Sequence, residues 1–341
     1  MIFDKNQSIF QSDFHREVWY WAIGIVPLAD SLTEEVRNKC DENILKSCYQ
    51  WYDYFNELCE DMYINANKYI PASARQYRDI LENIVSNGKL INNNIVLNIN
   101  DWNNYKNKIN KSKSYANLNI TVENCINLLN RTGLVYENID ENIIFKNIKY
   151  PEIFHAMKIF EHSPNIKKTP ARHHFAHCEF RQLFKSYSAT YSELLRPVSD
   201  ESLYIAQKIH DYAKSLKIQR YVHFDTIKYK HKNTRVLDFT ITGNEYPTLR
   251  VNIGTCVNEN NFENYYKYLL SANNNICDIF IKNLEKCDNF EHNHQIITIN
   301  NIKQKVCPYS RIKINPFKND IDAILYFISA RKNSIDKYYD M

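Results

Sequence analysis

Apolar residues recur at spacings of three and four through the first part of the chain, a pattern that predicts helices. Between Thr33 and about Ile70, Glu34 and Glu35 stand in the first turn, where a helix dipole favours negative charge. The apolar positions of this stretch are Val36, Cys40, Ile44, Cys48, Trp51, Phe55, Leu58, Cys59 and Met62. We expect one long amphipathic helix with room for a single break. Pro71 ends it, and a second helix follows over 72–85.

Shorter elements are expected in the rest of the first half. The segment 121–131 favours a short helix, and Gly133 follows it where a left-handed cap is needed. Strands are predicted at 134–137 and 143–146, and a helix from Pro151 toward Glu161. The Asn- and Lys-rich stretch 92–114 predicts a hairpin or an irregular excursion.

The second half begins with a capped helix. Ser199, followed by Asp200 and Glu201, opens a helix with an apolar face. The further expected elements are β-rich runs at 221–229, 235–242 and 248–255, helices near 262–270 and 276–284, a hairpin at 296–306 turning at Asn300-Asn301, and a last helix carrying 321–328. This order predicts an α+β sandwich and not a doubly wound sheet.

The length of 341 residues favours two domains. We expect a mostly helical domain with a small β-hairpin at 1–162, and a connector with a His-rich segment at 163–198. An α+β domain follows at 199–341. The predicted fold class is α+β.

Composition indicates an ordinary globular protein, with 44% hydrophobic and 24% charged residues. The excess of Asn, Lys, Ile and Tyr is typical of an AT-rich bacterial genome. Nine unclustered cysteines favour reduced thiols and a cytoplasmic location. The longest apolar stretch, Val18–Ala29, is too short to cross a bilayer, so no membrane association is expected. A net charge of +4 with scattered basic residues argues against a nucleic-acid partner.

The glycines exclude several common nucleotide-binding motifs. The nearest pair, Gly243 and Gly254, is too far apart for a dinucleotide fingerprint or a Walker loop. Serine-hydrolase, zinc-protease and kinase signatures are also missing. The sequence therefore points to no familiar enzyme class.

The densest polar cluster follows the predicted connector. His173 and His177 share one face on either a helix or a strand, with Cys178 beside them as a third donor. This arrangement predicts a metal site. The alternative is that these imidazoles cap a loop or line a domain interface.

A second set of metal-ligating types brackets the hairpin predicted at 296–306. Cys287, His292, His294 and Cys307 could converge at its base as a structural zinc site, although their spacing is looser than in a zinc ribbon. Cys277 lies on the apolar face of a helix and is expected in the core. The alternative is a group of scattered polar loop residues.

Three weaker features point elsewhere. His210-Asp211 resembles the metal-binding dipeptide of HD-type phosphohydrolases, but its helical pattern favours an ordinary surface pair. His223 and Asp225 share a strand face, which a cross-strand polar pair explains as easily. The segment 121–146 is similar to the end of a winged-helix module, with little basic support for DNA binding.

Several segments resemble uncharacterised hypothetical proteins of low-GC bacteria. They are TVENCINLLNRTGL, KYPEIFHAMKIF, HCEFRQL, LLRP, CPYSRIKINP and IDAILYFISARKNSID. The resemblance implies a zinc knuckle with additional cysteines near Cys287, where this chain has histidines instead. It carries no known activity and assigns no functional residue.

Three functions follow in order of support. The first is a non-catalytic protein that binds a small molecule or a protein partner between two domains. The second is a metal-dependent hydrolase using His173, His177 and Cys178. The third is a DNA-binding regulator using 121–146. No cofactor is required by the sequence, and zinc is the metal that its Cys and His ligands favour.

Overall fold

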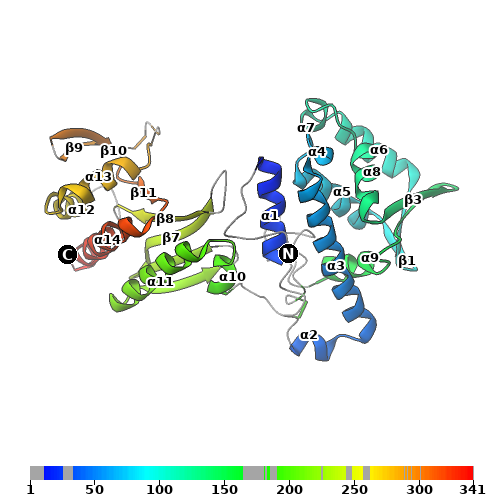
Figure 1. The fold of residues 1–341 in the computed structure, drawn as a ribbon, viewed down its shortest axis with the longest axis horizontal. Coiled ribbons are helices and arrows are strands. Elements are labelled where there is room, and N and C mark those ends of the chain that lie inside the picture. The colour runs from blue at the N-terminus through cyan, green and yellow to red at the C-terminus, as the bar shows by residue number, and fades with distance from the viewer. Residues whose placement is uncertain are drawn as a thin grey trace. The chain divides into compact units, whose positions relative to one another are not determined.

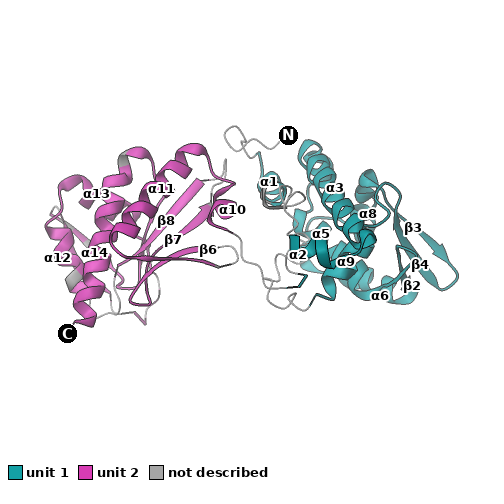
Figure 2. Ribbon diagram, turned by 90° about the horizontal axis from the view of Figure 1, so that it is seen from below, with its two compact units in different colours: residues 1–4, 8–187 teal, residues 5–7, 188–341 magenta. Residues whose placement is uncertain are grey.

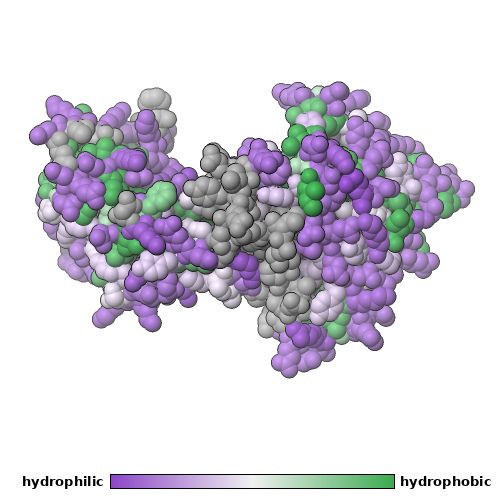
Figure 3. Space-filling view, in the orientation of Figure 1, coloured by the Kyte–Doolittle hydropathy of each residue, from purple (hydrophilic) through white to green (hydrophobic). Residues whose placement is uncertain are grey.

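The computed structural model describes residues 11–25, 34–163, 180, 183–184, 190–223, 226–242, 248–255, 262–287, 289, 291–292, 294–299 and 301–340. They belong to two compact units, each with its own hydrophobic core. Unit 1 comprises 1–4 and 8–187, and unit 2 comprises 5–7 and 188–341 (Figure 2). The surface seen in Figure 3 is largely hydrophilic, with hydrophobic residues in small separate areas.

Unit 1 is mainly helical and carries a small antiparallel sheet (Figure 1). Its helices are α1 (Asp13–Ile25), α2 (Glu34–Lys39), α3 (Glu42–Ile64), α4 (Ala66–Tyr69), α5 (Ala74–Asn87), α6 (Ile99–Asn110), α7 (Lys113–Ala116), α8 (Val122–Leu129) and α9 (Ile153–Glu161), with the 3₁₀ turn η2 (Asn130–Thr132). Its strands are β1 (Lys89–Ile91), β2 (Asn94–Asn98), β3 (Leu134–Ile139) and β4 (Asn142–Asn147), in the order β1-β2-β4-β3.

The expected long helix is three helices in sequence, α2, α3 and α4. Asp41 interrupts the pattern because its side chain accepts the N–H of Ile44 and so caps α3. A second break comes at Asn65. The apolar face predicted for this stretch is buried in α3, where Trp51, Phe55 and Met62 are each at most 2% exposed.

The hairpin expected at 92–114 is confirmed only for 92–98, which form its turn and the strand β2, and most of the stretch is instead the helix α6. Asn98 caps it by accepting the N–H of Asn100. Trp102, which is 2% exposed, packs against Tyr105 and Phe145 and anchors the helix to the sheet. Two large aromatic contacts thus outweigh the low helix propensity of the many asparagines.

Unit 2 is built on a five-stranded antiparallel sheet in the order β11-β8-β7-β6-β5. Its strands are β5 (Gln219–His223), β6 (Thr226–His231), β7 (Thr234–Thr242), β8 (Thr248–Gly254) and β11 (Arg311–Ile314), and β9 (Gln295–Ile299) pairs with β10 (Ile302–Val306) as a separate hairpin. Its helices are α10 (Tyr191–Leu195), α11 (Asp200–Ser215), α12 (Phe262–Leu270), α13 (Asn274–Asn283) and α14 (Ile321–Tyr339), the last preceded by the 3₁₀ turn η7 (Lys318–Asp320).

The helical layer lies on one side of this sheet (Figure 2). Ser199 caps α11 as expected, and the hairpin predicted around Asn300-Asn301 is present. The run expected as one strand at 221–229 is instead divided between β5 and β6. Two or three strands were expected before the last helix, and β11 is the third, for which no residue range was predicted. The fold is α+β.

Candidate metal centre

The segments that carry Cys287 and Cys307 are held side by side at one edge of the five-stranded sheet. After α13, Leu284 bridges Ile312 of β11, and the N–H of Glu285 donates to the carbonyl of Arg311. The hydroxyl of Ser310 donates to the carbonyl of Glu285 at 2.8 Å. These bonds place residue 287 opposite the turn that begins at Cys307.

A second set of bonds fixes this turn on β8. The N–H of Ser310 donates to the carbonyl of Cys307, which closes the turn. The buried hydroxyl of Thr255 lies 2.9 Å from the carbonyl oxygen of Pro308 and 2.8 Å from that of Ser310. Cys307 is therefore presented by a loop that the sheet already positions.

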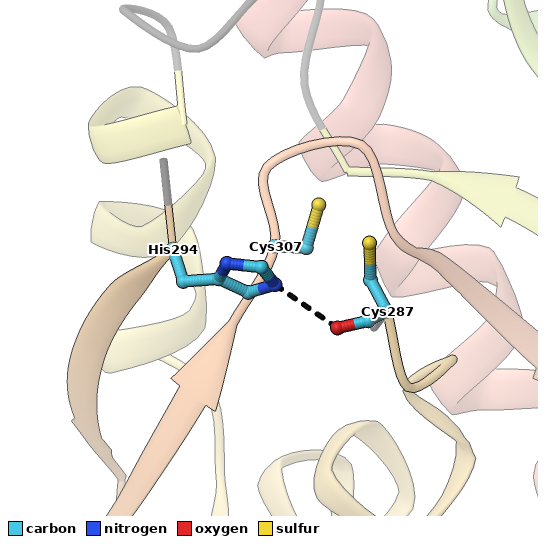
Figure 4. Close-up of side chains that lie close together, drawn as sticks. All are labelled: Cys287, His294 and Cys307. Atoms are coloured by element: carbon cyan, nitrogen blue, oxygen red, sulfur yellow. Dashed lines mark hydrogen bonds between the residues drawn. The ribbon is translucent and has the colours of Figure 1, made fainter. Parts of the chain in front are cut away.

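Cys and His donor atoms meet between these two segments. The donor atoms of Cys287, His294 and Cys307 all lie within 4.8 Å of one another (Figure 4). In Figure 4 the two sulfur atoms point in the same direction, with the imidazole of His294 beside Cys307. Nδ1 of His292 lies 3.3 Å from each of the two sulfurs. The structure thus brings together four residues that lie up to 20 positions apart in the sequence.

The two histidines are oriented by further contacts. Nε2 of His294 lies 3.0 Å from the carbonyl oxygen of Cys287. Nε2 of His292 lies 3.2 Å from the side-chain amide of Asn289, and its ring packs on Tyr309 with the ring centroids 4.8 Å apart. Sequence reasoning did not identify Asn289 and Tyr309. Asn289 lies three residues before His292 and Tyr309 two residues after Cys307, and this closeness in sequence to the candidate ligands is the only feature that could have indicated them.

Two thiols lie next to each other in the cluster, and this proximity affects their ionisation. Cys307 is 2% exposed, and Cys287 and His294 are half-buried. Burial raises the pKa of the Cys307 thiol above its usual range, and the neighbouring Cys287 raises this pKa further. A divalent cation between the sulfurs favours the thiolate forms, because opposite charge stabilises an ionised group.

The other sequence-predicted site residues are not part of this cluster. His173, His177, Cys178 and Asp225 lie outside the described residues, as does the side chain of His223. His210 contacts the hydroxyl of Tyr229 through Nδ1 and Arg220 through Nε2, both at 3.3 Å.

Two further expectations can be placed in the structure. Cys277 is buried in the core of unit 2, as expected from its position on α13. Arg131, a basic residue of the segment 121–146 that resembles a winged-helix module, binds Asp61 through Nε and through Nη2, at 2.7 Å each. This guanidinium is therefore already engaged within unit 1.

Comparisons of the chain with protein-family models, curated proteins and solved structures found no match. Within the described residues, no helix has the length and apolar character needed to cross a membrane.

Proposed function

We propose that the chain is a non-catalytic binding protein whose unit 2 is stabilised by a structural zinc ion, held by Cys287, His292, His294 and Cys307. The observations that support the zinc ion are the mutual approach of the donor atoms of Cys287, His294 and Cys307, and the position of His292 Nδ1 at 3.3 Å from both sulfurs. These residues come from the segment between α13 and β9 and from the turn before β11. Zinc is the metal because thiolate and imidazole together form its preferred ligand set.

The donor set favours a structural role over a catalytic one. Catalytic zinc sites usually have three protein ligands and leave one position for water, whereas structural sites are closed by four. Here Cys287, His294 and Cys307 supply three mutually close donors, and His292, with Nδ1 3.3 Å from both sulfurs, is the fourth residue that would close the site. Binding through Nδ1 of His292 requires its proton on Nε2. The amide nitrogen of Asn289 lies 3.2 Å from Nε2, and rotating this amide by 180° would place its oxygen there to accept that proton.

The segment between α13 and β9 has a specific need for such a metal. Its described residues after Leu284 form no helix or strand until Gln295, so backbone ladders contribute little to its stability. Metal binding to ligands that are apart in the unfolded chain adds directly to folding free energy. The ion would therefore fix the base of the β9–β10 hairpin against the sheet.

The first experiment measures zinc in protein purified without chelator. We expect one zinc per wild-type chain by elemental analysis, and its loss in the Cys287→Ser, Cys307→Ser double variant. Cys277→Ala is the matched control, because this thiol lies in the same unit but outside the cluster, and it should retain the metal. A wild-type protein that contains no zinc and takes up none at neutral pH would contradict the proposal.

A second measurement locates the effect of the metal. All four tryptophans, at positions 19, 21, 51 and 102, belong to unit 1, so tryptophan fluorescence reports on that unit. Chelation should lower the unfolding midpoint of unit 2, followed by far-UV circular dichroism, and leave the tryptophan transition in place. Equal shifts of both transitions would argue against a zinc ion confined to unit 2.

A further inference from the structure

Basic residues that are scattered in the sequence are brought onto one face of the five-stranded sheet by its register. One row across the strands pairs Tyr221 with Lys228, Lys228 with Asp238, Asp238 with Asn252 and Asn252 with Lys313. Side chains of directly paired residues share a face, and so do residues two positions apart on a strand. The basic residues assigned to this face are Lys228, Lys230, Arg235, Arg250, Arg311 and Lys313.

The helices of unit 2 occupy the opposite face. Tyr229 and His231 alternate with Lys228 and Lys230 on β6 and contact the helical layer, Tyr229 through His210 of α11 and His231 through Asp336 of α14. Figure 2 shows this layer on one side of the sheet, and no described helix lies over the basic face.

Few of these positive charges are neutralised within the described residues. Asp238 is the acid of the face, and it is only 5% exposed, bound by Arg235 at 3.0 Å and by Asn252 at 2.7 Å. Glu285 at the edge pairs with Lys313. Lys228, Lys230 and Arg311 form no ion pair with a described acidic residue. Within the described residues, this face therefore carries more positive than negative charge.

The face also carries groups suited to nucleotides. Tyr221, at 39% exposed, lies on the edge strand β5 with Nζ of Lys230 5.1 Å from its ring centroid. Gln219 and Thr240 add neutral polar groups to the face, whereas Asn252 is buried and its amide binds Asp238 and Thr240. Aromatic rings stack with bases of any sequence, and lysine and arginine neutralise phosphates.

We infer that the basic face of the sheet in unit 2 binds single-stranded nucleic acid. The inference adds a partner class to the binding protein proposed above. The observations behind it do not include the metal site, so it can be tested separately from the zinc ion. Recognition of a duplex usually inserts a helix or a β-ribbon into a groove, and no described element projects from this face. A flexible single strand can instead follow a flat array of cations, whose neighbours along a strand are about 6.6 Å apart.

The test uses the full-length protein and a fluorescein-labelled twelve-nucleotide oligo-dT, followed by anisotropy at several salt concentrations. We expect the Lys228→Gln, Lys230→Gln, Arg311→Gln triple variant to lower affinity at least tenfold at 50 mM salt. The slope of log affinity against log salt should fall by about 2, because each single-strand phosphate contact contributes about 0.7. Glutamine retains most of the aliphatic stem of each side chain, which limits effects on folding.

The matched control removes the same charge from the helices of the same unit. Lys208 and Lys214 of α11 and Lys267 of α12 are all exposed, and their triple change to Gln should leave affinity within about twofold of wild type. An equal loss in both triple variants would overturn the inference, since the binding would then reflect net charge alone.

Tyr221 provides a second test, because stacking of its ring on a base depends little on salt concentration. Tyr221→Ala should weaken binding about tenfold with an unchanged salt slope, whereas Tyr221→Phe should bind like wild type. Wild-type protein that does not bind the oligonucleotide at 50 mM salt would overturn the inference. So would protein that binds phosphatidylserine vesicles through these lysines but not the oligonucleotide. Zinc content, measured on the same preparations, tests the proposed function separately.

Discussion

Glu82 of α5 gives a pH-dependent test of the packing in unit 1. Burial raises the pKa of its carboxyl to about 7 from an ordinary value of 4.5, although nearby Arg78 acts to lower it. Oε1 is buried without a hydrogen bond and lies 3.4 Å from Nε of Arg78, which also binds Asp79 at 2.6 Å. The carboxylate form is thus poorly solvated in the folded protein.

The direction of the effect on stability follows from the raised pKa. The folded state holds the proton more tightly than the unfolded state, so the contribution of Glu82 is most favourable below pH 4.5 and is lost as the pH rises through 7. The full pKa difference corresponds to about 3 kcal/mol at about 1.4 kcal/mol per pKa unit. Because the side chain is 23% exposed and partly screened by solvent, we expect about 1–2 kcal/mol.

The variant Glu82→Gln removes the ionisation and keeps the shape. Its free energy of unfolding, from urea denaturation followed by tryptophan fluorescence, should match wild type at pH 4 and exceed it by about 1–2 kcal/mol at pH 8. A variant that is less stable than wild type at pH 8 would show that the ion pair with Arg78 outweighs the loss of solvation, and would refute the reasoning.

Glu123→Gln is a control of opposite sign in the same unit. Burial raises the pKa of Glu123, but the hydrogen bonds that it receives, from Lys106 at 2.8 Å and Asn110 at 3.3 Å among others, outweigh burial and hold this pKa below its usual range. Its favourable contribution is therefore present at neutral pH and lost as the pH falls below about 4. Glu123→Gln should destabilise unit 1 by up to about 1 kcal/mol at pH 7 and have less effect at pH 4.

Two further changes test the backbone and the limits of unit 2. Gly133 has φ of 93°, and a Cβ there would lie 2.7 Å from Oδ1 of Asn147. Gly133→Ala should therefore lower the free energy of unfolding, measured by urea denaturation, by about 2–4 kcal/mol. A decrease of less than about 1 kcal/mol would mean that the side chain of Asn147 moves aside freely. A fragment of residues 188–341 should unfold cooperatively when followed by circular dichroism. A shorter fragment of residues 197–341 should have a free energy of unfolding lower by about 2–4 kcal/mol. It lacks the buried Leu195, and it also lacks Tyr191, whose hydroxyl donates to the carbonyl of Ala206. Equal stability of the two fragments would show that α10 is dispensable.

The sequence predicted those elements whose information is local. The face of α11, the cap at Ser199 and the left-handed Gly133 were all read correctly, because spacing and cap chemistry act within a few residues. The turn at Asn300-Asn301 was also correct, and Asn301 has the positive φ that such turns favour.

The errors occurred where distant contacts decide the structure. The helix α6 depends on Trp102 packing against Phe145, which is more than forty residues away. The strand β11 is four residues long and is defined by its pairing with β8. Such short segments carry too few positions for a period to be recognised.

The candidate centre was only half predictable for the same reason. The residue types and their bracketing of a hairpin were visible, but their approach depends on the bridge from Leu284 to Ile312 and on Thr255. The basic face was not visible at all. Lys228 and Lys313 are 85 positions apart and share a row only through the two intervening strands, β7 and β8.

The candidate centre and the basic face meet at β11, and this connection gives the last prediction. Arg311 and Lys313 lie four and six residues after Cys307, on a strand at the edge of the sheet. Removing the metal should loosen this edge and impair both cations, while Lys228 and Lys230 stay in place on β6. For chelated protein, the slope of log affinity for oligo-dT against log salt should therefore fall by about 1.4, because two single-strand phosphate contacts are lost at about 0.7 each. The Arg311→Gln, Lys313→Gln variant should show the same slope before and after chelation. A further decrease on chelating that variant would mean that the metal supports more of the face than β11.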